Sequence, residues 1–299
     1  MAGKPKVAVH KFASCSGCQL AFVNMGEDLI ELATLVDLVH MAEVGSIAAE
    51  DEQVNIAFVE GSITTPHDVE RLEKIRANSK YLITIGACAT SGGIQALRNN
   101  ADTADWMRSV YAKPEFIQSL STSGAIANYV QVDFELWGCP VSSRQMFAAV
   151  RSFLLGVPPL SLREKVCQEC KRRGNVCILV TQDSPCMGPV TRTGCSALCP
   201  SFGAPCYTCY GPAEAINAPS FGLRLIGLGL SPDQVARRFA SINNAAPAFG
   251  GAVKPVLPAI ERRTIAEKLM PVSLELGGKS PTIVFADADL DVACAGVMF

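Results

Sequence analysis

The sequence lacks a long apolar run. Of its 299 residues 49% are hydrophobic, yet no segment approaches the roughly 18 consecutive apolar residues that a membrane-spanning helix requires. The amino terminus runs from Lys4 and Lys6 directly into a strand-like segment, with no long apolar segment and no twin arginine of an export signal. We therefore expect a cytoplasmic protein with no membrane span.

Excess charge of one sign is also absent. The formal net charge is −2, and no basic run is longer than the triplet 171–173, so the basic surface that attracts nucleic acid is not expected. No G-x-G-x-x-G motif follows a strand-like segment, which argues against a nucleotide site in this chain. The three histidines (His10, His40 and His67) are too scattered to predict a metal site.

Cysteine, by contrast, is abundant. The chain has 13 cysteines, and eight of them lie between Cys167 and Cys209 with the spacing C-x2-C-x6-C-x8-C-x8-C-x3-C-x6-C-x2-C. Cytoplasmic thiols are kept reduced, and an odd number cannot all pair as disulfides. Metal ligation is therefore the leading interpretation of these residues.

The residues before this segment alternate between strand-like and helical patterns. Strands are expected at 6–13, 54–61, 80–87 and 129–138, and helices at about 19–39, 65–78 and 140–155. This alternation predicts an α/β fold with a doubly wound, mostly parallel sheet that resembles flavodoxin. We expect a flavodoxin-like domain over residues 1–156, followed by a loop-rich domain over residues 157–249.

Four cysteines are placed where these strands end. Cys15 and Cys18 follow the first expected strand, Cys88 follows the third and Cys139 follows the fourth. Because the carboxyl ends of parallel strands meet at one edge of a sheet, the pattern predicts a site of four thiolates there. The alternative is that Cys88 and Cys139 are small buried hydrophobic residues. Glu60 lies at the same edge. Its role is open between a place beside the site, proton transfer, and a plain loop or interface role.

Twelve cysteines make three groups of four, which either zinc ions or iron-sulfur clusters could occupy. Zinc knuckles usually join two close C-x2-C pairs across a short loop, whereas the spacing here is irregular. Glycine or proline adjoins many of the cysteines and lets backbone N–H groups approach the sulfurs. The pattern therefore favours clusters, although the ferredoxin run C-x2-C-x2-C-x3-C-P is absent.

Seven motifs carry a more specific resemblance between about Lys6 and about Phe249. The chain resembles the small subunit of a cytoplasmic nickel-iron hydrogenase, of the sulfhydrogenase delta or viologen-reducing type. The motifs, in order, are SCSGCQL, IAFVEGS, IGACATSGGIQ, WGCPVS, CQECKRRGNVC, PCMGPVTRTGC and CYTCYGP.

This resemblance implies three 4Fe-4S clusters, each bound by four cysteines. The implied ligands are Cys15, Cys18, Cys88 and Cys139 for a proximal cluster; Cys167, Cys170, Cys177 and Cys186 for a distal cluster; and Cys195, Cys199, Cys206 and Cys209 for a medial cluster. All twelve are cysteines, whereas many exported relatives have a histidine at the distal cluster and a three-iron medial cluster.

The implied function is electron relay within a hydrogen oxidoreductase. Electrons would pass between the nickel-iron site of a large subunit and an acceptor module, such as a flavin- and iron-sulfur-containing diaphorase. The chain itself is expected to hold no catalytic residue, because a nickel site would need two further C-x2-C pairs and every pair present is already assigned.

Two other functions remain as alternatives. The first is the cluster-bearing small subunit of a quinone-reducing respiratory complex, which resembles the α/β half. That family typically carries an adjacent Cys-Cys pair and no second cysteine-rich domain, and neither holds here. The second is a zinc-binding scaffold without enzymatic function. Iron with acid-labile sulfide would support the relay, whereas colourless protein with zinc would support the scaffold.

The last part of the chain, residues 250–299, has a different character. A linker rich in proline and glycine precedes the motif LELGGKSP, which resembles an internal piece of an aldehyde dehydrogenase. Glu275 occupies the place of that family's general base. Cys294 does not match the surroundings of its nucleophile and is interpreted as an unassigned thiol. We expect no aldehyde dehydrogenase activity from this tail.

Overall fold

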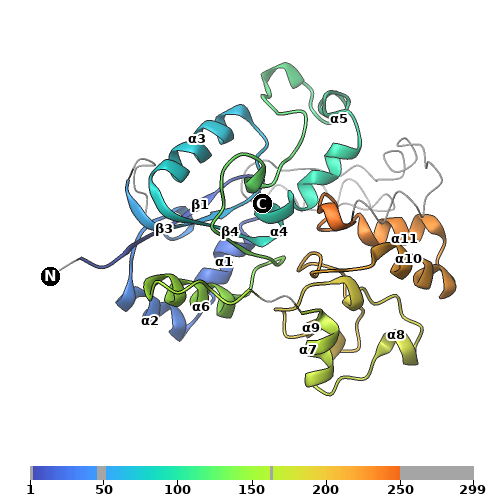
Figure 1. Cartoon of the computed structure of the whole chain (residues 1–299). Coiled ribbons are helices and arrows are strands. Elements are labelled where there is room, and N and C mark those ends of the chain that lie inside the picture. The colour runs from blue at the N-terminus through green and yellow to red at the C-terminus, as the bar shows by residue number, and fades with distance from the viewer. Residues whose placement is uncertain (1–2, 46–51, 162–163, 250–299) are drawn as a thin grey trace, which may run out of the picture.

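The computed structural model describes residues 3–45, 52–161 and 164–249. Its centre is a five-stranded parallel sheet with the strand order β2-β1-β3-β4-β5 (Figure 1). This order is that of flavodoxin-like doubly wound sheets, which confirms the predicted fold class. The strands are β1 (Lys6–Lys11), β2 (Asp37–Met41), β3 (Val54–Glu60), β4 (Ser79–Ile85) and β5 (Phe134–Leu136).

Helices connect the strands and make up most of the regular structure beyond them. The α-helices are α1 (Gly17–Val23), α2 (Glu27–Leu35), α3 (Pro66–Ala77), α4 (Gly86–Ser91), α5 (Thr103–Val110), α6 (Ser143–Leu154), α7 (Val166–Arg172), α8 (Ile178–Thr181), α9 (Leu198–Ser201), α10 (Ala218–Gly227) and α11 (Pro232–Phe239). The 3-10 helices are η1 (Ala42–Val44), η2 (Ile94–Asn100), η3 (Pro114–Phe116), η4 (Ile126–Asn128) and η5 (Gly188–Val190). None of these described helices is both long and apolar enough to cross a bilayer.

The prediction of one helix over 19–39 is wrong, because the structure has two helices there, followed by a strand. The chain leaves the helical path at Gly26, whose φ of 64° lies in the left-handed region that favours glycine. A second helix follows, and β2 then pairs with β1 in parallel. Apolar residues continue across the break, so their helical spacing concealed both the turn and the extra strand.

The last strand is shorter than the predicted range 129–138. Asp133 accounts for the later start, because its carboxylate accepts a hydrogen bond from the backbone N–H of Leu82 at 2.7 Å. A side chain thus takes a place that a backbone carbonyl would take in a continued ladder. Regular pairing with β4 begins only at Phe134.

Helix α3 begins where the sequence predicts. The Thr65 hydroxyl accepts from the backbone N–H of Asp68, the Asp68 side chain accepts from the backbone N–H of Thr65, and Pro66 is the first helical residue. This reciprocal pair satisfies N–H groups that have no partner within the helix. Helix α6 likewise confirms the helical pattern before Gly156.

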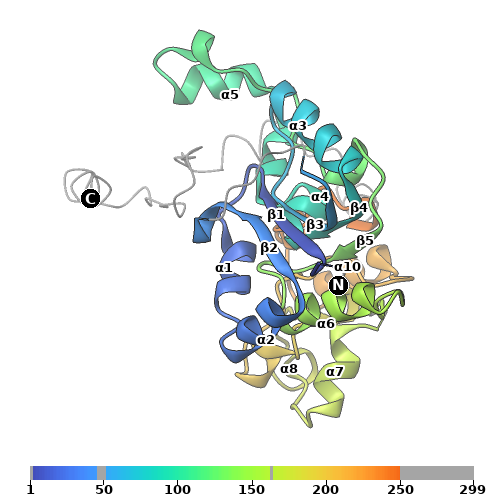
Figure 2. The ribbon, with the colours of Figure 1, turned by 90° about the vertical axis from the view of Figure 1, so that its left-hand side faces the viewer.

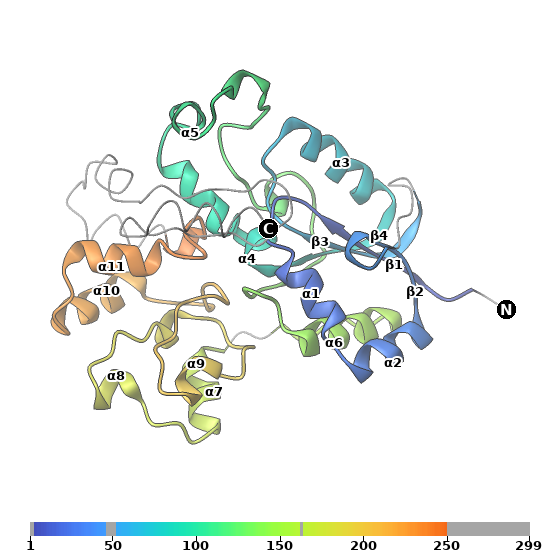
Figure 3. The ribbon, with the colours of Figure 1, turned by 180° about the vertical axis from the view of Figure 1, so that it is seen from behind.

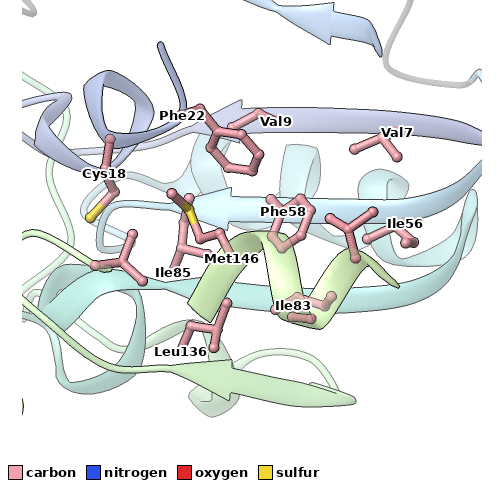
Figure 4. Close-up of a cluster of buried hydrophobic side chains, with 14 of the residues drawn as sticks. Val7, Val9, Cys18, Phe22, Ile56, Phe58, Ile83, Ile85, Leu136 and Met146 are labelled. Atoms are coloured by element: carbon pink, nitrogen blue, oxygen red, sulfur yellow. The ribbon is translucent and has the colours of Figure 1, made fainter. Parts of the chain in front are cut away.

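Each face of the sheet has its own hydrophobic core. Val7 and Val9 point into a core shared with Phe22 of α1 and Met146 of α6 (Figure 4). Ala8, between them, belongs to the opposite core, which α3 covers, as expected from the alternation of side chains along a strand. Figure 2 shows α1, α2 and α6 on one side of the sheet and α3 on the other.

Residues 164–249 form a loop-rich region with a third core. Its buried side chains come from short helices and from the cysteine-bearing loops, and include Val166, Met187, Leu225 and Phe239. Figures 1 and 3 show this region beside the end of the sheet where α4 lies. The predicted tail over 250–299, with Glu275 and Cys294, lies outside the described residues.

Candidate metal-cluster sites

The structure brings the first cysteine group, Cys15, Cys18, Cys88 and Cys139, to the carboxyl edge of the sheet. Cys15 follows β1, Cys18 lies in α1, Cys88 lies in α4 directly after β4, and Cys139 follows β5. The thiol of Cys88 interacts electrostatically with Cys15 and Cys139, and that of Cys18 with Cys88 and Cys139. Doubly wound sheets bind ligands at this edge.

Glycine allows the backbone to pass close to two of these sulfurs. A Cβ atom at Gly86 would lie 2.3 Å from the Sγ atom of Cys18, and one at Gly93 would lie 2.7 Å from the Sγ atom of Cys88. Both glycines also have positive φ angles, 84° and 60°. Any larger residue would push into the space beside the thiols, so this backbone is a fitted cradle for a sulfur-bound group.

The first group is half enclosed. Burial raises the pKa of the Cys18 thiol, with a smaller contribution from Glu60, and burial raises the pKa of Cys88 to about 12. Cys15 and Cys139 are exposed. A bound metal cation would stabilise the buried thiolates that the protein alone disfavours. The donor set therefore fits a metal site that opens toward the surface.

Glu60 is buried beside this group, with 1% of its surface exposed. Its Oε2 atom accepts a hydrogen bond from the backbone N–H of Gln19 at 2.8 Å, and Ser14 hydrogen-bonds to the same carboxylate. Burial raises the pKa of Glu60 despite these bonds. Glu60 thus holds both ends of the loop that carries Cys15 and Cys18.

The second cysteine group, Cys167, Cys170, Cys177 and Cys186, gathers around α7. The thiol of Cys167 interacts electrostatically with the other three, and burial raises its pKa to about 11. A Cβ atom at Gly188 would lie 3.3 Å from the Sγ atom of Cys167 and 3.6 Å from that of Cys186. Glycine therefore lines this group as well.

The third cysteine group, Cys195, Cys199, Cys206 and Cys209, lies between the first two. Cys209 interacts electrostatically with the other three members and with Cys139 of the first group. On its other side, the backbone N–H of Cys206 donates to the Sγ atom of Cys186 in the second group at 3.3 Å. The spatial order along the molecule is thus first, third, second. Burial raises the pKa values of Cys206 and Cys209 to about 12.

Zinc ions and iron-sulfur clusters place different demands on four thiolates. Within the described residues, no three His, Cys, Asp or Glu side chains come close enough together to hold one metal ion. A tetrahedral zinc ion needs its sulfurs about 2.3 Å from a common centre. A multi-iron cluster binds each thiolate through a different iron atom.

Several neighbours of the thiols were not identified from the sequence. Gln95 accepts from the Sγ atom of Cys88 at 3.3 Å and donates to the carbonyl of Ala13 at 2.9 Å. The buried Tyr210 interacts electrostatically with Cys18 and Cys209, which belong to different groups. Tyr210 directly follows Cys209 in sequence, and that position was the one signal that could have revealed it.

The three histidines lie apart from these cysteine groups. His10 and His40 are buried on neighbouring strands, and their rings stack with centroids 4.5 Å apart. Burial, together with His40 and Arg71, lowers the pKa of His10 from 6.5 to about 3. His67 is exposed on α3.

Two protein families match separate parts of the chain. Residues 15–153 match NADH ubiquinone oxidoreductase, 20 Kd subunit, which is the respiratory alternative considered for the α/β half. The second and third cysteine groups lie outside that match. Residues 254–299 match the aldehyde dehydrogenase family, in agreement with the motif of the tail.

A full-length relative decides between the alternatives. Sulfhydrogenase 2 subunit delta from Pyrococcus furiosus is 32% identical over 235 residues, which span 78% of this chain and 97% of that protein. The chain belongs to the nickel-iron hydrogenase small subunits. It is therefore the electron-transfer, iron-sulfur subunit of a hydrogenase complex and works with a large subunit.

Other relatives agree with this placement. NAD-reducing hydrogenase HoxS subunit delta from Cupriavidus necator is 29% identical over 171 residues, covering 52% of this small subunit and 81% of that one. The actinobacterial-type NiFe-hydrogenase from Ralstonia eutropha H16 has a TM-score of 0.52 at 15% identity, over 88% of this chain and 90% of that chain. At that identity the structural match supports the fold alone.

Proposed function

We propose that this small subunit carries electrons through three 4Fe-4S clusters, one held by each cysteine group. The order of the three groups in space is the main support. The first and third groups meet through Cys139 and Cys209, and the third and second through Cys206 and Cys186. A relay needs such a continuous series, since electrons tunnel efficiently only between close centres.

Under this proposal the first group is proximal, the third medial and the second distal. When bound, 4Fe-4S clusters accept and release electrons one at a time. The exposed Cys15 and Cys139 belong to the group that would face the large subunit. The exposed Cys177 belongs to the distal group, from which electrons would leave the chain.

The residues of the chain contribute binding, enclosure and hydrogen bonding. Glycines such as Gly86 and Gly188 leave room beside the sulfurs, while burial of Cys18 and Cys206 excludes water from one side of each site. Polar contacts such as that of Thr191 Oγ1 with Cys206 Sγ at 3.4 Å are of the kind that tunes cluster potentials.

The acceptor is proposed to be a diaphorase that contains flavin and iron-sulfur centres. The support is the similarity to the delta subunit of a hydrogenase that is named NAD-reducing. We further infer a cytoplasmic location, where the many reduced cysteines of this composition would be maintained. The proposed organisation is a flavodoxin-like domain over 1–156, an iron-sulfur domain over 157–249, and a linker with an aldehyde-dehydrogenase-like fragment over 250–299.

Metal and sulfide analysis of the anaerobically purified complex tests this proposal. We expect about twelve irons and about twelve acid-labile sulfides bound by this chain, with electron paramagnetic resonance signals of three 4Fe-4S centres after reduction. Fewer than about eight irons in the fully loaded chain, or a native three-iron signal, would contradict it. About three zinc ions and no sulfide would instead support the zinc scaffold.

A further inference from the structure

A short segment after α11 joins two of the cysteine groups. Asn243 in this segment is fully buried. Its Nδ2 atom donates to the backbone carbonyl of Thr208 at 2.7 Å, and its Oδ1 atom accepts from the Ser91 hydroxyl at 2.8 Å. The amide of Asn243 therefore hydrogen-bonds to two segments, at Thr208 and at Ser91, that are far apart in the sequence.

Both of these partners belong to cysteine-bearing elements. Ser91 ends α4, the helix that carries Cys88. Thr208 lies between Cys206 and Cys209, and its carbonyl also accepts from the backbone N–H of Gly211 at 2.8 Å, which closes the turn around Cys209. Asn243 thus connects an element of the first group to a turn of the third group.

A second contact holds the same turn from another direction. Gly211 packs directly against the ring of Trp137, since an added Cβ atom would lie 2.2 Å from the Cε3 atom of that ring. Trp137 stands two residues before Cys139. The backbone N–H of Arg192 donates to the Gly211 carbonyl at 3.0 Å, and its guanidinium lies 5.2 Å from the centre of the Trp137 ring.

The neighbouring asparagine fastens the same segment to the first group. The Nδ2 atom of Asn244 donates to the backbone carbonyl of Gly93 at 2.9 Å. Gly93 is the residue whose backbone passes the Sγ atom of Cys88. Two consecutive asparagines therefore anchor the segment on α4 and on the loop that follows it.

We propose that Asn243 is a positioning residue that fixes the separation between the first and third cysteine groups, and with it the rate of electron transfer between the centres they hold. This inference rests on the proposed function, because it concerns transfer between two bound clusters. The amide matches both partners at once, whereas alanine would leave buried polar groups of Ser91 and Thr208 with fewer hydrogen bonds.

The test compares Asn243→Ala with Asn99→Ala in the purified hydrogenase complex. Asn99 also uses both amide ends, donating to the carbonyl of Ser123 at 2.8 Å and accepting from its backbone N–H at 2.7 Å, but it binds a single loop. The measurements are iron content, magnetic coupling between the reduced clusters, hydrogen–deuterium exchange, and hydrogen-dependent dye reduction.

For Asn243→Ala we expect unchanged iron content and exchange, weaker magnetic coupling between two clusters, and dye reduction lowered about tenfold, the factor that corresponds to about 1.4 kcal/mol. Asn99→Ala should leave coupling and reduction as in the parent. If Asn243→Ala loses iron, Ser91→Ala, which removes only one of the two hydrogen bonds, takes its place in the comparison.

Coupling and dye reduction equal to those of the Asn99→Ala control would overturn the positioning role. A parent complex without three iron-sulfur signals would instead overturn the proposed function, so the two failures are distinguishable.

Discussion

At the scale of single residues, the meeting of the first cysteine group at one edge of the sheet was predictable, but the setting of its thiols was not. The sequence shows where thiols follow strands, and parallel topology brings those strand ends together. It does not show that Gly86 and Gly93 line the sulfurs, because that depends on two backbone segments that meet only in the folded chain. The role of Glu60 as a tie across the Cys15–Cys18 loop is of the same kind.

The glycine beside Cys18 provides a residue-scale prediction. We expect Gly86→Ala to lose about four irons per chain, because its Cβ atom would lie 2.3 Å from the Cys18 Sγ atom. Gly156→Ala is the matched control, since Gly156 also has a positive φ, 68°, but has open space around it. That control should lower the free energy of unfolding by about 1–2 kcal/mol and keep its iron. Equal iron content in Gly86→Ala and Gly156→Ala would show that cluster binding does not depend on glycine beside the Cys18 sulfur.

The buried histidine pair provides a second prediction at the scale of single residues. The pKa of His10 is lowered from 6.5 to about 3, so the folded protein keeps His10 neutral while the unfolded chain takes up a proton below pH 6.5. Its contribution to stability is therefore present above pH 6.5 and is lost as the pH falls toward 3. Between pH 6.5 and 5 we expect the free energy of unfolding to fall by about 2 kcal/mol from this group.

Anaerobic urea unfolding at the two pH values measures this change. His10→Leu should reduce the pH dependence by that amount, whereas His67→Gln, at an exposed position on α3, should leave it unaltered. Identical pH profiles for His10→Leu and the parent would show that the buried ring does not govern acid stability.

At the scale of helices and strands, strong local sequence patterns predicted the elements correctly, whereas weak patterns did not. The strands β1, β3 and β4 and the helices α3 and α6 were predicted from their apolar patterns and, for α3, from its Thr65-Pro66 start. Strand β2 was missed because the helical periodicity runs through Gly26. Strand β5 was predicted too long because the sequence gives no sign that the Asp133 carboxylate bonds to β4.

The start of α3 provides the element-scale prediction. Thr65→Ala removes the hydroxyl that accepts from the Asp68 N–H, and should lower the free energy of unfolding by about 1 kcal/mol. Iron content should not change, because the cap holds no cysteine. Thr181→Ala is a control, as the hydroxyl of this exposed residue only bonds back to the Cys177 carbonyl. A cap variant as stable as the parent would show that the cap is redundant.

At the scale of the whole molecule, the order of the three groups could be inferred from the family resemblance but not from spacing. The second group precedes the third in sequence, yet the third lies next to the first in space. The reversal arises because the turn at Thr208–Gly211 packs against Trp137 and Asn243, contacts that no local pattern encodes.

The tail gives a whole-molecule prediction. Residues 254–299 match the aldehyde dehydrogenase family, and covalent aldehyde oxidation needs an activated nucleophile, a base and a nicotinamide pocket built by a complete fold. Removing residues 260–299 should leave iron content and hydrogen-dependent electron transfer unchanged. NAD-dependent aldehyde oxidation by the purified chain, or loss of complex assembly in the truncated form, would contradict this expectation.

The central claim is that electrons pass through this chain from the first group to the second. Comparison of Cys18→Ala with Cys170→Ala in the hydrogenase complex tests it most directly, with hydrogen–deuterium exchange and acceptor reduction measured on each. We predict that Cys18→Ala abolishes acceptor reduction at the start of the relay, and that Cys170→Ala lowers acceptor reduction while exchange at the nickel site is retained. Indistinguishable effects of the two substitutions on exchange and on reduction would contradict the order of the relay.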